Sequence, residues 1–105
     1  MNLKIITENQ NKKIKADKIA EILSEALDYK ILSVNPYYKF PNSFEILFET
    51  DINDTDKVLR TLTTICQPWS VRFDNEKNLE LTFNKSENSE FTNEVFNVIK
   101  WAHLN

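Results

Sequence analysis

The sequence contains no glycine in 105 residues, although average proteins carry about 7%. Glycine adopts left-handed backbone at little cost and lets a ligand approach the main chain closely. Phosphate-cradling loops, dinucleotide-binding turns and EF-hand calcium loops all use it. The absence of glycine therefore excludes sites of these kinds. It leaves the turns to asparagine, aspartate, serine and proline.

Cysteine and histidine are scarce, with only Cys66 and His103. One thiol cannot form an intramolecular disulfide, and these two residues alone cannot fill a zinc site. Cys66 falls on an apolar helical stripe, where cysteine behaves as a small hydrophobe. No signal peptide and no apolar run of membrane-spanning length is present. We therefore expect a cytoplasmic protein in a reducing compartment, without membrane contact, metal or cofactor, and not an enzyme.

The carboxylates do not form a catalytic or metal-binding pattern. Asp51, Asp54 and Asp56 superficially resemble a cation cluster, but acidic residues also favour a helix N-terminus, and the second predicted helix begins there. Glu45 and Glu49 share one face of a predicted strand. They are about 13 Å apart, too far for a glycosidase pair. We interpret the aspartates as helix-capping residues and the glutamates as part of an exposed acidic stripe.

The net charge of −3 is unevenly distributed. Residues 1–40 hold seven basic and five acidic residues (+2), and residues 41–105 hold six basic and eleven acidic residues (−5). An acidic chain repels phosphate backbones, and the 43–48 strand is acidic and lacks the glycine of an RNA-recognition motif. Direct nucleic-acid binding is therefore not expected. A basic protein partner matches the charge better, although the acids could also serve only solubility.

Apolar spacing predicts a single α+β domain over residues 1–105. Alternation favours strands near 3–6, 29–34, 44–49, 69–73 and 79–83. Helical spacing favours helices over 16–27, 58–66 (stopped by Pro68) and 91–102. In the 74–78 hairpin turn we expect asparagines at positive φ. The order is βαββαββα, an antiparallel sheet with helices on one face, and its first six elements match the ferredoxin-like arrangement.

Two adjacent tyrosines are the most distinctive polar surface feature. They lie between Pro36 and Pro41, in a connection that cannot be a central strand. Tyrosine is enriched at binding interfaces. Together with nearby acidic residues they form the predicted partner-binding set, which comprises Tyr37, Tyr38, Glu45, Glu49, Asp51 and Asp54.

Over its whole length the chain resembles the immunity proteins of bacterial polymorphic toxins, including those of contact-dependent growth inhibition. The resemblance is one of size, acidic charge and missing catalytic motifs, and no shared motif allows a functional residue to be transferred. It implies a protein that neutralises a basic toxin domain, often a nuclease, by occluding its active site. The alternative is a ligand-binding or regulatory ferredoxin-like domain that self-associates through a sheet edge.

Overall fold

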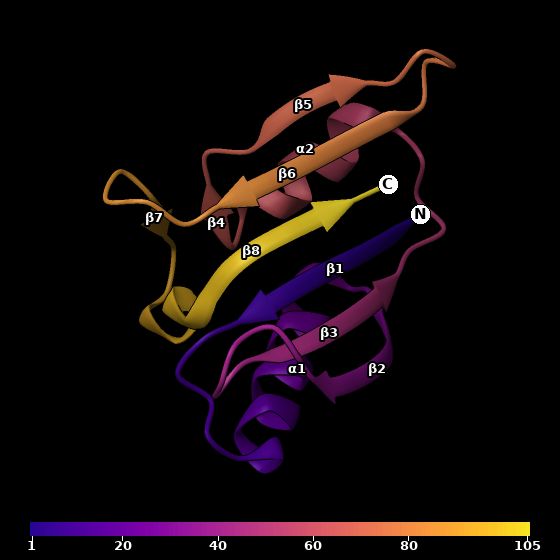
Figure 1. Cartoon of the computed structure of the whole chain (residues 1–105). Helices are drawn as coiled ribbons and strands as arrows, with labels where there is room; N and C mark the ends of the chain where they lie inside the picture. The colour runs from indigo at the N-terminus through magenta and orange to yellow at the C-terminus, as the bar shows by residue number, and fades with distance from the viewer.

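The computed structural model describes residues 1–105 as a large sheet with two helices behind it (Figure 1). The strands are β1 (Asn2–Thr7), β2 (Lys30–Pro36), β3 (Phe44–Glu49), β4 (Cys66–Gln67), β5 (Ser70–Phe73), β6 (Leu79–Asn84), β7 (Glu90–Phe91) and β8 (Ile99–Leu104). The helices are α1 (Lys13–Leu27), α2 (Thr55–Thr63) and the 3-10 helix η1 (Glu94–Val98). None of them is long and apolar enough to cross a membrane.

The main sheet has six strands in the order β2-β3-β1-β8-β6-β5, and every neighbouring pair is antiparallel. The first and last strands therefore lie side by side at its centre (Figure 1). Reciprocal backbone hydrogen bonds of 2.9 and 3.1 Å join Asn2 to Asn105. β4 and β7 form a separate two-stranded sheet.

One face of the sheet carries the core. Alternation along β1 directs Leu3 and Ile5 towards the helices and Lys4 and Ile6 to the opposite face, which we call the open face. Twenty buried apolar residues from both helices and the sheet form a single cluster. Its largest side chain in β6, Phe83, lies between the rings of Trp69 and Phe91, with centroids 5.6 and 5.8 Å away. The predicted α+β class, with an antiparallel sheet and helices on one face, is confirmed.

The helix predicted over 91–102 is wrong, and with it the order βαββαββα. The chain there forms β7, η1 and the central strand β8. A 3-10 helix repeats every three residues. In β8 a β-bulge at Lys100, opposite β1, places Ile99 and Ala102 on the core face although they are three residues apart. The three-residue repeat of η1 and the bulge in β8 together give the apolar residues the spacing that is typical of an amphipathic helix.

The ferredoxin-like arrangement expected for the first six elements is not confirmed. The unit from β1 to β3 gives the order β2-β3-β1. After α2, however, the chain enters β4 in the small sheet, and β8 takes the position beside β1. Three helix boundaries also differ from prediction. α1 begins at Lys13 rather than Ala16. α2 begins at Thr55 rather than Val58 and ends at Thr63, so Cys66 lies in β4.

Four residues other than glycine adopt positive φ: Asn9 (59°), Asp28 (58°), Asn42 (55°) and Lys77 (64°). Asp28 is the C-cap of α1, where glycine is the usual residue. In the β5–β6 turn we expected an asparagine at positive φ, but the residue that adopts it is Lys77. There the Asp74 carboxylate accepts hydrogen bonds from the amides of Asn78 and Glu76, each 2.9 Å long. The hydrogen bonds from Asn78 contribute most to lowering the pKa of the Asp74 carboxyl, and the bond from Glu76 also lowers it.

Replacing Lys77 with glycine should remove a local backbone cost. Left-handed backbone costs a residue other than glycine about 1 kcal/mol or more, and glycine would remove this cost. Part of the stability gained is offset because glycine has greater conformational freedom in the unfolded chain. We expect Lys77→Gly to leave the free energy of unfolding unchanged or to raise it by up to about 1 kcal/mol. Denaturant unfolding measures this. Lys18→Gly within α1 is the control and should lose about 1 kcal/mol. Equal losses in the two variants would contradict the strain at Lys77.

Candidate functional site

The open face carries a hollow of about 590 Å³ over the centre of the sheet. Its lining combines lysines with aromatic rings from three strands and one loop. The lining residues are Lys4, Ile6, Tyr37, Lys39, Phe40, Asn84, Lys85, Lys100 and Trp101. Apolar hollows of 300–1,000 Å³ with a few converging polar groups are typical binding sites. We take this lysine-aromatic hollow as the candidate functional site.

The β-bulge in β8 builds one wall of the hollow. Because Lys100 is the extra residue opposite Ile6 and Thr7, Lys100 and Trp101 are both kept out of the core, while Ile99 is fully buried. A regular strand would send adjacent side chains to opposite faces. Bulges recur beside functional sites because they redirect side chains in this way. The bulge thus brings a cation and an indole to the same surface.

The loop from Tyr37 to Ser43 forms the opposite wall. The backbone amide of Gln10 donates to the Asn42 carbonyl at 2.9 Å, which ties the loop to the segment after β1. The Phe40 ring centroid lies 3.7 Å from the Lys100 amino nitrogen, a close cation–π contact across the hollow. Ile6, although on the open face, is only 3% exposed. The loop therefore converts a flat sheet surface into a concave one.

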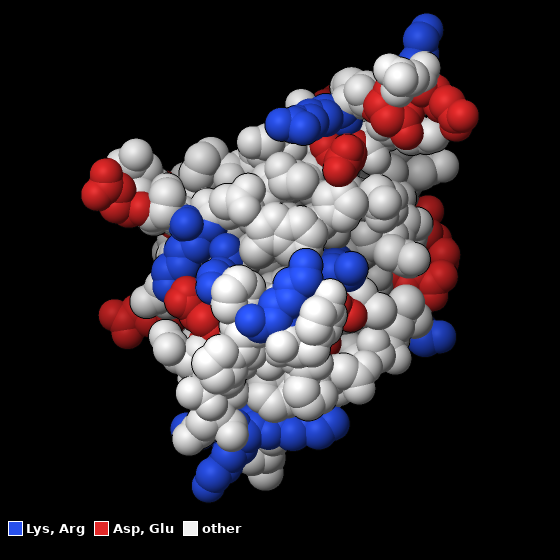
Figure 2. Space-filling view, viewed as in Figure 1, with Lys and Arg blue, Asp and Glu red and all other residues white.

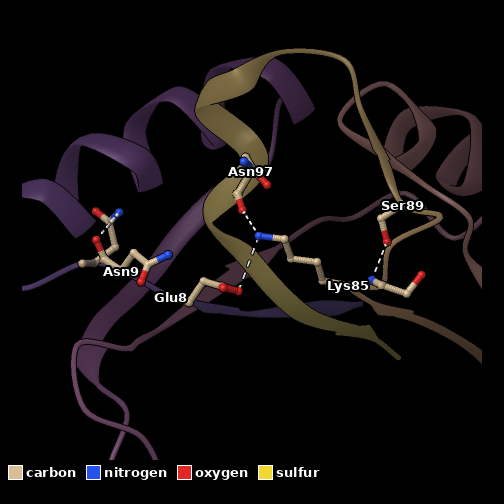
Figure 3. A network of polar contacts seen from close by, with 7 residues as sticks. Glu8, Asn9, Lys85, Ser89 and Asn97 are labelled. Carbon is tan, nitrogen blue, oxygen red and sulfur yellow. Dashed lines mark hydrogen bonds and ion pairs between the residues drawn. The ribbon is translucent and has the colours of Figure 1, made fainter.

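The four lysines of the hollow differ in how they are held. The Lys85 amino group donates to the Asn97 carbonyl at 2.7 Å and lies 3.5 Å from the Glu8 carboxylate (Figure 3). Lys4 has a longer ion pair of 3.9 Å with Glu45.

Lys39 and Lys100 form no ion pair within 4.0 Å and contact aromatic rings instead. Two ammonium groups of the hollow therefore have no carboxylate partner in the chain.

Basic side chains gather over the middle of the open face, with acidic side chains beside and around them (Figure 2). Three carboxylates on or beside this face are each engaged by another side chain of the chain. Glu8 pairs with Lys85, and Glu45 pairs with Lys4. The Glu80 carboxylate forms a 2.7 Å hydrogen bond with His103. The surface is thus positive at its centre and negative around it, although the whole chain is acidic.

Comparisons with protein-family models, curated proteins and solved structures find no match.

The predicted partner-binding set does not form one patch. Tyr37 lines the hollow, Tyr38 packs beside it with ring centroids 5.5 Å apart and is 86% exposed, and Glu45 lies nearby on β3. Glu49 lies at the other end of β3, paired with Asn2 rather than Ile6. The structure thus divides the set between two ends of the sheet.

At that second end the aspartates precede α2. Asp54 is the N-cap of α2, and its side chain accepts a 3.1 Å hydrogen bond from the amide of Lys57. This confirms the predicted capping role for Asp54, whereas Asp56 lies within the first turn of α2 and Asp51 forms no capping hydrogen bond. Asp51 is exposed in the preceding segment. No three histidine, cysteine, aspartate or glutamate side chains lie close enough together to hold a metal ion.

Cys66 is fully buried, and burial raises the pKa of its thiol to about 12. The thiol is therefore protonated at neutral pH, and the thiolate is the nucleophilic form of cysteine. Its backbone carbonyl accepts a 2.8 Å hydrogen bond from the Trp69 indole. The contacts of Cys66 are those of a core residue.

Sequence reasoning missed most of the hollow. Lys4, Lys85 and the adjacent pair Lys100 and Trp101 are far apart in the sequence and meet only because β1, β6 and β8 are neighbours. One signal was present, since Lys4 and Ile6 alternate with the buried Leu3 and Ile5. The wrong helix over 91–102 concealed the rest.

The positive centre of the hollow should be measurable through Trp101. In a Trp69→Phe variant, Trp101 is the only indole, so its fluorescence reports on the hollow. With each ion's quenching normalised to its quenching of free N-acetyltryptophanamide, we expect iodide to quench Trp101 at least about twofold more efficiently than caesium at constant ionic strength, because local positive potential concentrates anions. Adding Lys4→Gln and Lys100→Gln should abolish the difference, whereas Lys15→Gln and Lys18→Gln on α1 should preserve it. Equal normalised quenching by both ions would contradict a cationic hollow.

Proposed function

We propose that this chain is a small, non-catalytic binding protein that captures a protein partner on the open face of its sheet. The observation that carries this proposal is the lysine-aromatic hollow, which occupies the face that no helix covers. We favour the function of a bacterial immunity protein that acts in the cytoplasm. Such a protein neutralises a toxin domain by covering its active site.

The aromatic side chains of the hollow are of the kinds that protein interfaces favour. Interfaces are enriched in tyrosine, tryptophan and phenylalanine, and a few such anchors carry most of the binding energy. Here Tyr37, Phe40 and Trp101 line the hollow, and Phe40 is 45% exposed. A partner that covers these rings would bury them without rearranging the core, since they lie on the side of the sheet opposite to the helices.

The charges favour a partner that is basic overall. The net charge of −3 attracts a cationic domain from a distance, while the carboxylates around the hollow offer contacts for lysines and arginines. A cationic nuclease toxin fits this description. The acidic residues Glu49 and Asp51 at the far end of β3 would then assist the approach rather than form the centre of the interface.

An affinity experiment with matched surface variants tests this proposal. The immobilised chain is exposed to lysate of its native host, and retained proteins are identified and then purified. We expect one basic protein to bind the wild-type chain. Its affinity for the Lys100→Glu/Trp101→Ala variant should be at least about 30-fold lower. Its own activity should be lost when it is saturated with the wild-type chain. The matched control Lys15→Glu/Lys18→Glu on α1 should bind normally. Circular dichroism checks that each variant is folded.

Two results would count against the proposal. Loss of binding only in Glu49→Lys/Asp51→Lys would move the interface to the other end of β3. A partner whose activity is unchanged by saturating chain would overturn the immunity function while leaving the binding surface in place.

A second candidate function, self-association through a sheet edge, is favoured by β5. This edge strand is four residues long and exposed throughout, with Val71 and Phe73 at 42% and 60% exposure. Unpaired edges with apolar side chains are sites of strand addition. If the chain self-associates there, sedimentation should give a dimer that Val71→Lys/Phe73→Lys converts to a monomer. A wild-type monomer at high concentration would exclude this candidate.

A further inference from the structure

The lysines of the hollow indicate which chemical group the partner presents. Lys39 and Lys100 carry full charges without a carboxylate partner within 4.0 Å. Each amino group lies over an aromatic ring instead, at 5.8 Å from the Tyr38 centroid and 3.7 Å from the Phe40 centroid. A cation–π contact orients an ammonium group but does not neutralise it. Both groups can therefore still donate hydrogen bonds to an anion.

Lys85 is held differently and serves to fix the wall of the hollow. Its contacts with Asn97 and Glu8 join the end of β6 to η1 and to the segment after β1 (Figure 3). The chain therefore contains an internal example of the same chemistry, in which one of these lysines already binds a carboxylate and a carbonyl. The neighbouring lysines that lack such a partner have the same donors to offer.

We propose, building on the proposed function, that the hollow binds an acidic segment of the protein partner, with carboxylates on Lys39 and Lys100 and an apolar side chain against Trp101. A carboxylate accepts charge-assisted hydrogen bonds from lysine, which are stronger than bonds between neutral groups. The volume of about 590 Å³ is sufficient for a few side chains. The occupant is thus an acidic element on the surface of an otherwise basic partner.

The charge pattern favours a protein segment over a nucleic-acid strand. A strand that crosses the open face would bring phosphates past Glu8, Glu45 and Glu80, all of which lie on or beside it. Nucleic-acid-binding domains are typically strongly basic, whereas this chain has a pI of about 5.1. A short acidic segment surrounded by basic groups matches both the positive centre and the negative surroundings.

Defined probes test this inference without the natural partner. The experiment follows Trp101 fluorescence in the Trp69→Phe background. The first probe is the peptide acetyl-Glu-Asp-Phe-Glu-Asp-amide, and the second is its neutral match, acetyl-Gln-Asn-Phe-Gln-Asn-amide. The third probe is octathymidylate, a short single strand of DNA. Each is titrated at low ionic strength, where contacts between exposed charges are strongest.

We expect the acidic peptide to bind and the neutral peptide to bind at least about tenfold more weakly. Lys39→Gln/Lys100→Gln should weaken the acidic peptide about tenfold, because two charge contacts are lost. The matched control Lys15→Gln/Lys18→Gln changes the net charge equally on α1 and should leave affinity within about twofold.

Three outcomes would overturn the acidic-segment assignment. They are no change on adding acidic peptide, equal affinity for the neutral peptide, and tighter binding of octathymidylate. Any of them would leave the proposed function standing if a host protein is still retained on the open face, so the two failures can be told apart. Loss of that retention alone would overturn the proposed function and not the chemistry of the hollow.

Discussion

Lys100 is the extra residue in the ladder between β8 and β1, and both faces of the sheet depend on its position. Before it, Ile99 faces the core; after it, Ala102 and Leu104 do the same. Without the bulge, the part of β8 before Lys100 or the part after it would have to turn its apolar side chains to solvent, because a shift of one residue exchanges the two faces of a strand. The same bulge presents Lys100 and Trp101 together on the open face. Core packing and the candidate site thus follow from one irregularity.

The absence of glycine restricts how the loops are built without preventing tight turns. Asn42 adopts the left-handed conformation directly after Pro41, and this reversal returns the chain to β3 after it has crossed the open face. Asparagine tolerates this region better than most residues. The loop can therefore place Phe40 against Lys100. A composition without glycine excludes phosphate loops, yet it is compatible with a concave site made by side chains.

The sequence was sufficient to predict the features that depend on local periodicity. The strands at 44–49 and 79–83, the capping role of Asp54 and the α+β class were all predictable, because each is specified by neighbouring residues. The 91–102 segment was not, since a 3-10 turn and a bulge change the phase of the pattern. The hollow was not predictable either. Its lysines come from β1, β8, the residue that follows β6 and one loop, and only strand pairing brings them together.

Charge acts at two distances in this molecule, and this explains why totals over the sequence did not locate the site. Before contact, a partner senses mainly the net charge, which is negative, and this attraction is largely screened beyond a Debye length of about 8 Å in physiological salt. At contact it meets individual groups. Lys85 and Lys100 belong to residues 41–105, which total −5, yet both line the positive centre of the open face. A basic partner with an acidic element at its centre is therefore attracted by the net charge as it approaches and matched by individual groups at contact.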